Sequence, residues 1–174
     1  NGTKARIVAV DGAAMFSLVK SPRLKGHAME VGPLARYVIG YVKGIPEFKD
    51  PTDMVLQKLG GVPVTALFST LGRTAARGLE CSWAAHKLKD EFNKLVANIK
   101  AGDTATANMA NFEPSTWARS AKGHGFVEAP RGALCHWIDI EDKKIKNYQC
   151  VVPTTWNASP RDASGKIGAY EAAL

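Results

Sequence analysis

The chain has 174 residues, of which 45% are hydrophobic and 22% charged, a composition typical of one globular domain. No run of about 18 apolar residues and no secretory signal is present, so the sequence predicts neither a membrane-spanning helix nor an export leader. The formal net charge is +7 at pH 7, but the basic residues are scattered, apart from a small group at Lys143, Lys144 and Lys146. This favours a solvated surface or a face for an acidic partner over nucleic-acid binding.

The amino-terminal third combines strand and helix signals. Residues Ala5 to Val10 and Phe16 to Val19 favour two short strands around an Asp11-Gly12 turn. A helix is predicted from Gly26 to Tyr41, with Pro33 in its first turn or at a kink. The cap-like run Asp50 to Asp53 predicts a second, short helix from Met54 to Leu59.

The remaining sequence predicts one long helix and one hairpin. Apolar residues repeat at helical spacing from about Val64 to Ile99, which predicts a core-packing helix about 50 Å long. Residues 104–122 are predicted to be irregular and anchored by a buried Trp117. Two β-rich runs, Ala133 to Ile140 and Lys144 to Val152, flank a charged turn and predict a hairpin. The fold class is therefore α+β, predominantly α.

The three cysteines, Cys81, Cys135 and Cys150, are isolated and form no CxxC pair. Neither a disulfide framework nor metal-ligand spacing is visible, so buried free thiols are expected. The sequence also lacks HExxH, Walker, GxSxG and dinucleotide-binding patterns.

An arginine is held in a constrained setting at Glu128-Ala129-Pro130-Arg131-Gly132. Proline fixes its own φ and glycine permits a tight turn, so the Arg131 guanidinium is aimed. Because antiparallel strands bring the start of the first and the end of the second together, Arg131 and Thr154 are expected to border one pocket. Such a pair suits an anionic or polar diatomic ligand. The alternative is a structural arginine that bonds loop carbonyls, and Glu128 is a possible ion-pair partner for it.

Two histidines are weaker candidates. His27, at the expected start of the first helix, is either a proton carrier or a satisfied, partly buried histidine. His136, beside Trp137, is interpreted as sheet packing.

Three long motifs resemble those of nickel–iron hydrogenase large subunits, especially the membrane-associated uptake group. They are Gly26-His27-Ala28-Met29-Glu30-Val31-Gly32-Pro33-Leu34-Ala35-Arg36, then Glu128 to Leu134, then Tyr148 to Asn157 followed by Ser159-Pro160-Arg161-Asp162. The similarity covers nearly the whole chain, including the run from Ser69 to Arg73. It implies a hydrogenase large-subunit-like fold with long core helices and a small antiparallel hairpin.

The resemblance also implies a cofactor that this chain does not hold alone. The family carries a nickel bridged to an iron with two cyanides and one carbon monoxide, held by four thiolates from two CxxC pairs. Neither pair is present, and the carboxyl-terminal residues Gly168 to Leu174 read as the first turns of a longer helix. We therefore expect residues 1–174 to be a single partial domain, an internal segment that is inactive alone.

The resemblance assigns surrounding residues. Arg131 and Pro130 match the residues above the open metal position, where the arginine assists heterolytic H2 cleavage as a base or an electrostatic orienter. Thr154 matches a hydroxyl that hydrogen-bonds a cyanide, a position at which many relatives have Ser. The main-chain carbonyl of Cys150 matches a ligand of a separate magnesium or iron ion. His27 matches a position near the site.

The implied activity is H2 oxidation, with electrons passed to an iron–sulfur small subunit and, as a further partner, a membrane cytochrome b. The implied location is the periplasmic side of the cell membrane, after export with the small subunit. Two alternatives remain: a nickel-free, hydrogenase-related structural or electron-transfer subunit of a respiratory complex, and a basic binding module. The CxxC pairs would separate the first of these from a hydrogenase, and salt-dependent nucleic-acid affinity would support the second.

Overall fold

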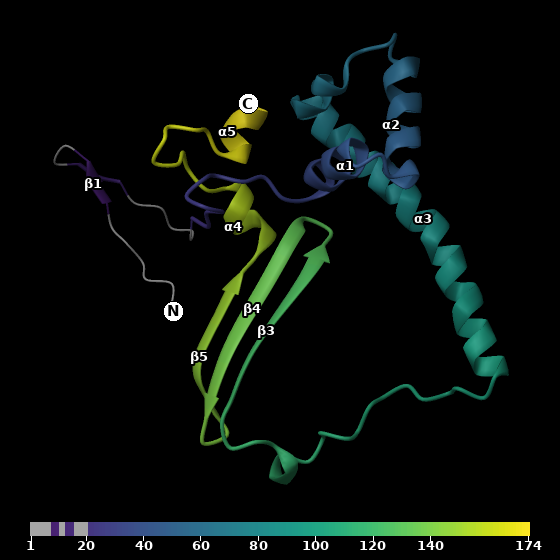
Figure 1. Cartoon of the computed structure of the whole chain (residues 1–174), viewed down its shortest axis with the longest axis vertical. Coiled ribbons are helices and arrows are strands. Elements are labelled where there is room, and N and C mark those ends of the chain that lie inside the picture. The colour runs from purple at the N-terminus through teal and green to yellow at the C-terminus, as the bar shows by residue number, and fades with distance from the viewer. Residues whose placement is uncertain (1–7, 11–12, 16–20) are drawn as a thin grey trace.

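The computed structural model describes residues 8–10, 13–15 and 21–174. Helices α1 (Pro33–Val42), α2 (Pro46–Lys58), α4 (Pro153–Asn157) and α5 (Ala169–Ala173) lie at one end of the molecule, as Figure 1 shows. From this end, α3 (Thr70–Lys100) and a three-stranded antiparallel sheet extend as two separate arms. The predicted α+β class with helix dominant is confirmed.

A small hairpin precedes the helices. Strands β1 (Val8–Val10) and β2 (Ala13–Met15) pair antiparallel, so the predicted first strand is present in its last three residues. Its earlier residues and the predicted strand from Phe16 to Val19 lie outside the described residues.

Helix α1 begins seven residues later than predicted. Lys25 and Gly26 have φ of 53° and 88° and form a turn closed by a bridge between Leu24 and His27. Gly32, with φ of 113°, precedes Pro33 at the first helical position. A helix cannot run through these positive φ values, so the predicted start at Gly26 is wrong. The placement of Pro33 in the first turn is confirmed, and the helix ends at Val42, one residue beyond the predicted end.

Helix α2 begins at Pro46 rather than at Met54, because Pro46, not Pro51, occupies the first turn. The predicted cap at Asp50 to Asp53 is therefore wrong, and these residues lie inside the helix. Within it, the Thr52 hydroxyl donates to the Phe48 carbonyl at 2.7 Å.

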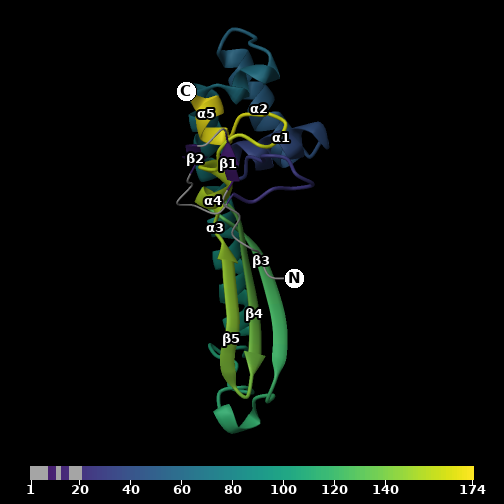
Figure 2. The same ribbon diagram turned by 90° about the vertical axis from the view of Figure 1, so that its left-hand side faces the viewer.

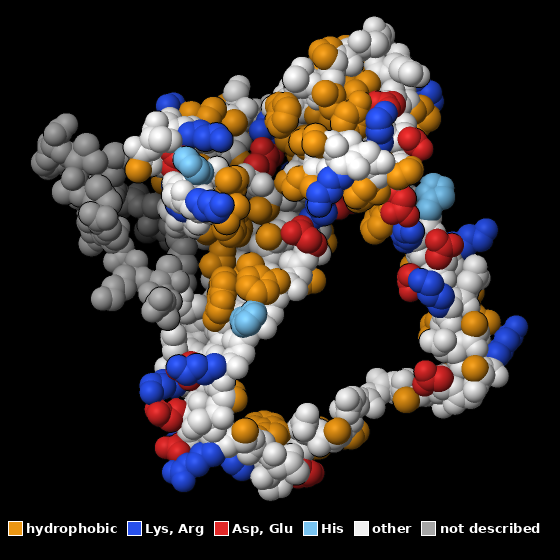
Figure 3. Space-filling view, in the orientation of Figure 1, with side chains coloured by type: hydrophobic (Ala, Val, Ile, Leu, Met, Phe, Trp, Pro, Cys, Tyr) orange, Lys and Arg blue, Asp and Glu red, His pale blue; other side chains and the backbone are white. Residues whose placement is uncertain are grey.

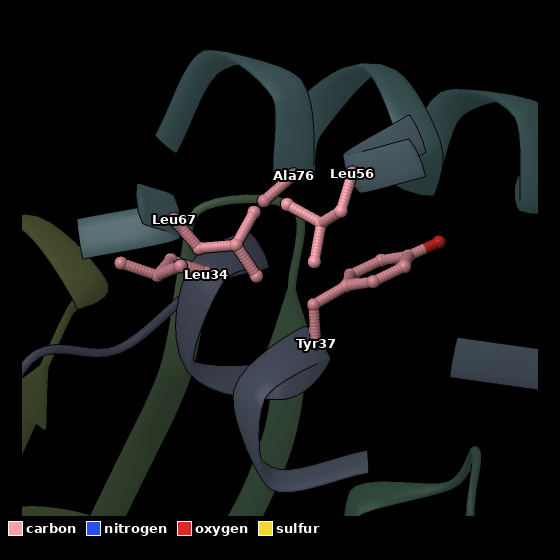
Figure 4. Packing of buried hydrophobic residues seen from close by; sticks show 5 residues of the cluster. All are labelled: Leu34, Tyr37, Leu56, Leu67 and Ala76. Atoms are coloured by element: carbon pink, nitrogen blue, oxygen red, sulfur yellow. The ribbon is translucent and has the colours of Figure 1, made fainter. Parts of the chain in front are cut away.

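The long helix is interrupted near its start. Residues Val64–Phe68 form a 3-10 turn, and α3 begins after Ser69, whose hydroxyl accepts a hydrogen bond from the Gly72 N–H at 3.0 Å. A small core joins this region to α1 and α2, as Figure 4 shows, and its buried members are Leu34, Tyr37, Leu56, Leu67 and Ala76. The rings of Tyr37 and Phe48 pack edge to face, with their centroids 5.2 Å apart.

Apolar side chains in the second half of α3 are left uncovered by the described part of the chain. Leu88 and Phe92 are 71% and 60% exposed, so the predicted core-packing role is wrong for this half. In the space-filling view, this half of α3 and the sheet stand on opposite sides of an open space (Figure 3).

The predicted hairpin is confirmed as β4 (Gly132–Glu141) and β5 (Lys144–Val151), and a third strand, β3 (Ala121–Ala129), pairs with β4. Figure 2 shows the three strands side by side, with α4 beyond the end of β5. The connection from α3 contains a short 3-10 turn, Pro114–Thr116, and Trp117 is 48% exposed rather than buried. Among the described residues, no helix combines the length and apolar character needed to span a membrane.

The Ser69 cap generates a stability prediction. Ser69→Ala removes the acceptor for the Gly72 N–H and should lower the free energy of unfolding by about 1 kcal/mol. Thermal unfolding measures the change. Ser82→Ala, at an exposed position inside the same helix, is the matched control and should have little effect; equal losses in the two variants would contradict the capping role.

Candidate functional site

A pocket of about 300 Å³ lies where α3, the sheet and the carboxyl-terminal helices meet. Arg131 and Thr154 both line it, as the sheet geometry predicted. The other lining residues come from the segment before α1, the first turns of α3, and α4 and α5: Glu30, Val31, Pro33, Leu34, Thr70, Arg73, Thr74, Arg77, Asn157, Ala169, Tyr170 and Ala173.

Arg131 lies in a two-residue turn at the end of the sheet. Ala129 pairs with Gly132, which leaves Pro130 and Arg131 as the turn residues. The Arg131 guanidinium makes no hydrogen bond or ion pair to any described residue, and it is exposed at the pocket. The structural alternative, in which Arg131 bonds loop carbonyls, is therefore not what the chain forms.

A different arginine bonds those carbonyls. Arg36 of α1 donates to the carbonyls of Ala129 at 3.1 Å and Pro130 at 3.0 Å. It also forms the ion pair with Glu128, at 2.6 Å, that the sequence analysis considered for Arg131. The pairing of Glu128 with Arg131 is thus replaced by a pairing with Arg36.

The turn also touches the chain just before α1. A Cβ added to Gly32 would lie 2.6 Å from the Arg131 carbonyl oxygen, and one added to Gly132 would lie 2.6 Å from the Gly32 nitrogen. Both glycines have φ between 110° and 130°, at 113° and 129° respectively. Only glycine satisfies both the conformation and the approach, so this pair sets how closely the turn packs on α1.

Side chains at the end of α4 and just after it hold the segment that precedes α1. The Asn157 side chain accepts from the Val31 N–H and donates to the Val31 carbonyl, both at 2.9 Å. The Asp162 carboxylate accepts from the Ala28 N–H at 3.0 Å. These bonds satisfy backbone groups that an extended segment leaves without helical partners.

Asp162 is buried and strongly hydrogen-bonded. The Ser164 hydroxyl and the N–H of Ala28 donate to the carboxylate and hold the pKa of Asp162 well below its usual range. The N–H groups of Lys166 and Ser164 add to this effect. His27 Nδ1 lies 3.6 Å from the same carboxylate, so a protonated His27 would face a negative charge.

The pocket contains two arginines, Arg73 and Arg77, in addition to the predicted Arg131. Arg73 and Arg77 lie outside the apolar face of α3, and both line the pocket one helical turn apart. Arg73 is neutralised by Glu30 through two hydrogen bonds, of 2.9 and 2.7 Å. Arg77, like Arg131, has no ion-pair partner among the described residues. The sequence signal for this was the i, i+4 spacing of Arg73 and Arg77 just after the Ser69 cap, which places both arginines on one face of the helix.

Two predicted residues lie away from the pocket. His27 is 54% exposed in the turn before α1, rather than partly buried at a helix start. Cys150 is exposed on β5 opposite His136. Neither lines the pocket, and their roles near the metals stay predictions.

The expectation of buried thiols holds for one cysteine of three. Cys135 is buried, and burial raises the pKa of its thiol, whereas Cys81 and Cys150 are exposed. Within residues 8–10, 13–15 and 21–174, no three His, Cys, Asp or Glu side chains gather in a way that could hold a metal ion.

The sequence and the fold place the chain in a family. The sequence model of the nickel-dependent hydrogenases matches residues 2–174. The chain therefore belongs to the nickel-dependent hydrogenase family, as its motifs predicted.

Relatives with known names give a finer description. The chain is 62% identical to the uptake hydrogenase large subunit of Rhizobium leguminosarum bv. viciae and 61% identical to that of Bradyrhizobium diazoefficiens. Each alignment covers 99% of this chain and 29% of the relative. The fold resembles the NiFeSe hydrogenase of Desulfovibrio vulgaris Hildenborough, with a TM-score of 0.69 and 34% identity, over 93% of this chain and 32% of that one. The chain thus spans less than a third of the length of these proteins.

The low pKa of Asp162 makes the free energy of unfolding depend on pH in the acid range. Above the ordinary carboxyl pKa of about 3.9, its ionised form stabilises the fold, and the contribution is lost as the pH falls toward the lower folded value. Asp162→Asn should therefore lower the thermal unfolding midpoint at neutral pH and lessen its decline below about pH 4. Midpoints measured across acid pH test this. Asp142→Asn, at the far turn of the sheet, is the control; an Asp162→Asn variant that keeps the parent's acid dependence would contradict the assignment.

Proposed function

We propose that this chain is the site-forming internal part of the large, catalytic subunit of a nickel–iron uptake hydrogenase. The reaction is the reversible heterolytic cleavage of H2 to two protons and two electrons, with the electrons passed to an iron–sulfur small subunit. The uptake hydrogenase large subunits to which the chain is 61–62% identical support this proposal. The observation that carries it is the pocket that Arg131 and Thr154 line together, with the Arg77 and Arg131 guanidinium groups unpaired among the described residues.

The residues of this pocket fit a metal centre with anionic diatomic ligands. The guanidinium groups of Arg77 and Arg131 line it without a partner among the described residues, and so does the Thr154 hydroxyl. The hydroxyls of Thr70 and Thr74 also line it, but they donate to the carbonyls of Ala173 and Thr70. Cyanide is an anion, and charge-assisted hydrogen bonds to it are worth roughly 1.5–3 kcal/mol each. The thiolate ligands of the metals belong to CxxC pairs, which this sequence does not contain.

When bound, the nickel–iron centre supplies the acceptor for the electron pair of H2. The chain's own contribution is electrostatic and positional. The Arg131 guanidinium stays charged when water is excluded, so it stabilises developing negative charge and orients the proton that leaves. Pro130 fixes the backbone beside it. The Thr154 hydroxyl, at the second position of α4, would donate a hydrogen bond to a cyanide of that centre.

Two further assignments belong to the same proposal. The main-chain carbonyl of Cys150 would be a ligand of a second ion, magnesium or iron, together with groups outside this chain. His27, facing Asp162, is a polar residue close to the centre. Neither residue lines the pocket, so both act from its surroundings.

The partners and location follow from the same relatives. A hydrogenase large subunit works with a small-subunit partner, and we propose iron–sulfur clusters in that partner and a membrane cytochrome b as the next acceptor. The complex would then act at the periplasmic side of the cell membrane. Membrane fractionation of the native complex tests the location.

Arg131→Lys tests the proposed role of the guanidinium. The lysine keeps the charge but loses the planar fork, so H2 oxidation by the complete enzyme should fall about 10²–10⁴-fold, while nickel and iron contents stay unchanged. Turnover and metal analysis of the purified complex give the answer. Arg119→Lys, at the opposite end of the same sheet, is the control. Full turnover in Arg131→Lys would remove Arg131 from the mechanism.

Thr154 offers a second test through a matched pair of substitutions. Thr154→Ser keeps a hydroxyl and should retain the assembled centre, whereas Thr154→Val removes the donor at nearly constant volume. The lost hydrogen bond, roughly 1.5–3 kcal/mol, should reduce both metal occupancy and turnover in the valine variant alone. Metal content and H2 oxidation are measured in the two variants. Similar losses in both would point to packing rather than to the hydroxyl.

A further inference from the structure

We propose that Arg36 is the positioning residue that aims Arg131 into the pocket, by clamping the Pro130–Arg131 turn to α1 and α3. The effect of Arg36 on turnover rests on the proposed function. The contacts behind this proposal join the start of α1 to the residues on both sides of the Pro130–Arg131 turn.

The guanidinium of Arg36 uses all of its donors. The Nε–H and one terminal nitrogen donate to the two carboxylate oxygens of Glu80 on α3, at 2.7 and 2.8 Å. The remaining donors reach the end of β3 and the turn: Glu128 at 2.6 Å, the Ala129 carbonyl at 3.1 Å and the Pro130 carbonyl at 3.0 Å. Five contacts match the five N–H donors of a guanidinium, so no other side chain replaces this set.

The turn needs support from outside because its own conformation is not the favoured one. Two-residue hairpins prefer turns with positive φ at one or both central residues, which match the twist of the strands. The other turn of this sheet follows that rule, with φ of 51° at Asp142 and 61° at Lys143. Proline cannot adopt a positive φ, and Arg131 does not have one. The Pro130–Arg131 turn is therefore held by contacts rather than by preference.

The position of the clamp relates it directly to Arg131. The Pro130 carbonyl belongs to the same peptide unit as the Arg131 N–H, so fixing that oxygen fixes the plane from which Arg131 departs. Gly32 contacts the following carbonyl, that of Arg131 itself. Gly32 and Arg36 lie one helical turn apart and are joined by a hydrogen bond from the Arg36 N–H to the Gly32 carbonyl at 3.0 Å. Arg36 and Gly32 thus contact the peptide units on the two sides of Arg131.

The charges of the clamp are well matched. Arg36 and Glu80 are largely buried, with 19% and 24% of their side chains exposed. Although burial disfavours the charged guanidinium, hydrogen bonds to Glu80 and Glu128 outweigh it and raise the pKa of Arg36 above its ordinary value. Arg36 therefore stays charged and bonded to the turn, and it does not itself line the pocket.

A double-mutant cycle in the complete enzyme separates positioning from general stabilisation. Arg36→Lys keeps the charge but loses most of the clamp, and should lower H2 turnover at least 10-fold with nickel content unchanged. In an Arg131→Lys background the same substitution should have little further effect, because the residue it positions is already altered. Equal factors in the two backgrounds would overturn the inference, since a purely structural loss acts independently of Arg131.

Local amide exchange provides the readout that does not depend on activity. Arg36→Lys should speed exchange at the non-proline residues of 129–132. The control is Arg23→Lys, because Arg23 bonds the carbonyls of Pro160 at 2.7 Å and Arg161 at 3.2 Å and should affect that segment instead. Unchanged exchange at 129–132 in Arg36→Lys would overturn the inference. If exchange rises there while Arg131→Lys keeps full turnover, the clamp on the turn is supported and the proposed role of Arg131 fails.

A milder variant covers the case in which Arg36→Lys does not assemble. Glu128→Gln removes the charge of one exposed clamp partner and leaves the rest in place. It should change turnover and exchange in the same direction by smaller factors. A Glu128→Gln enzyme with faster exchange at 159–162 but not at 129–132 would count against the clamp.

Discussion

The contact between the first turn of α1 and the Pro130–Arg131 turn is the constraint on which the rest of the site depends. The sheet is a long arm whose far end reaches away from the helices, so its near end must be fixed if any of its residues is to act precisely (Figure 1). Gly32 and Gly132 let the two backbones meet, and Arg36 fastens them together. Because Arg36 also bonds Glu80, the same side chain joins this end of the sheet to α3.

Backbone satisfaction explains why motifs far apart in the sequence occur together. The segment before α1 is extended, and its N–H and carbonyl groups need partners from elsewhere. Asn157 and Asp162 supply them, across more than 120 residues of sequence. The segment in turn brings Glu30 to Arg73. These distant motifs therefore depend on one another, because the side chains of one complete the hydrogen bonding of another.

The sequence predicted the parts of the fold that depend on local preference. The hairpin turn, the α3 repeat and the place of Pro33 all follow from neighbouring residues. The shared pocket of Arg131 and Thr154 then follows from the antiparallel pairing of the two hairpin strands. Other features depend on distant contacts. Strand β3 contains Gly123 and Gly125 and is exposed along nearly all of its length, so it has no alternating pattern. Helical periodicity indicated that α3 has an apolar face, but not which half is covered. The sequence also could not show that Arg36, rather than Arg131, bonds the carbonyls of the turn, because Arg36 lies more than 90 residues away along the chain.

Charge balance connects the shape of the pocket to what it is suited to hold. Three arginines and one glutamate line it, and the glutamate neutralises Arg73. Two guanidinium charges, on Arg77 and Arg131, are left without a partner among the described residues, and their mutual repulsion is reduced only by water or by an anion. A group that brings negative charge and excludes water would therefore gain more from these arginines than it would at the surface. The residues around the pocket therefore indicate that it is suited to an anion that displaces water.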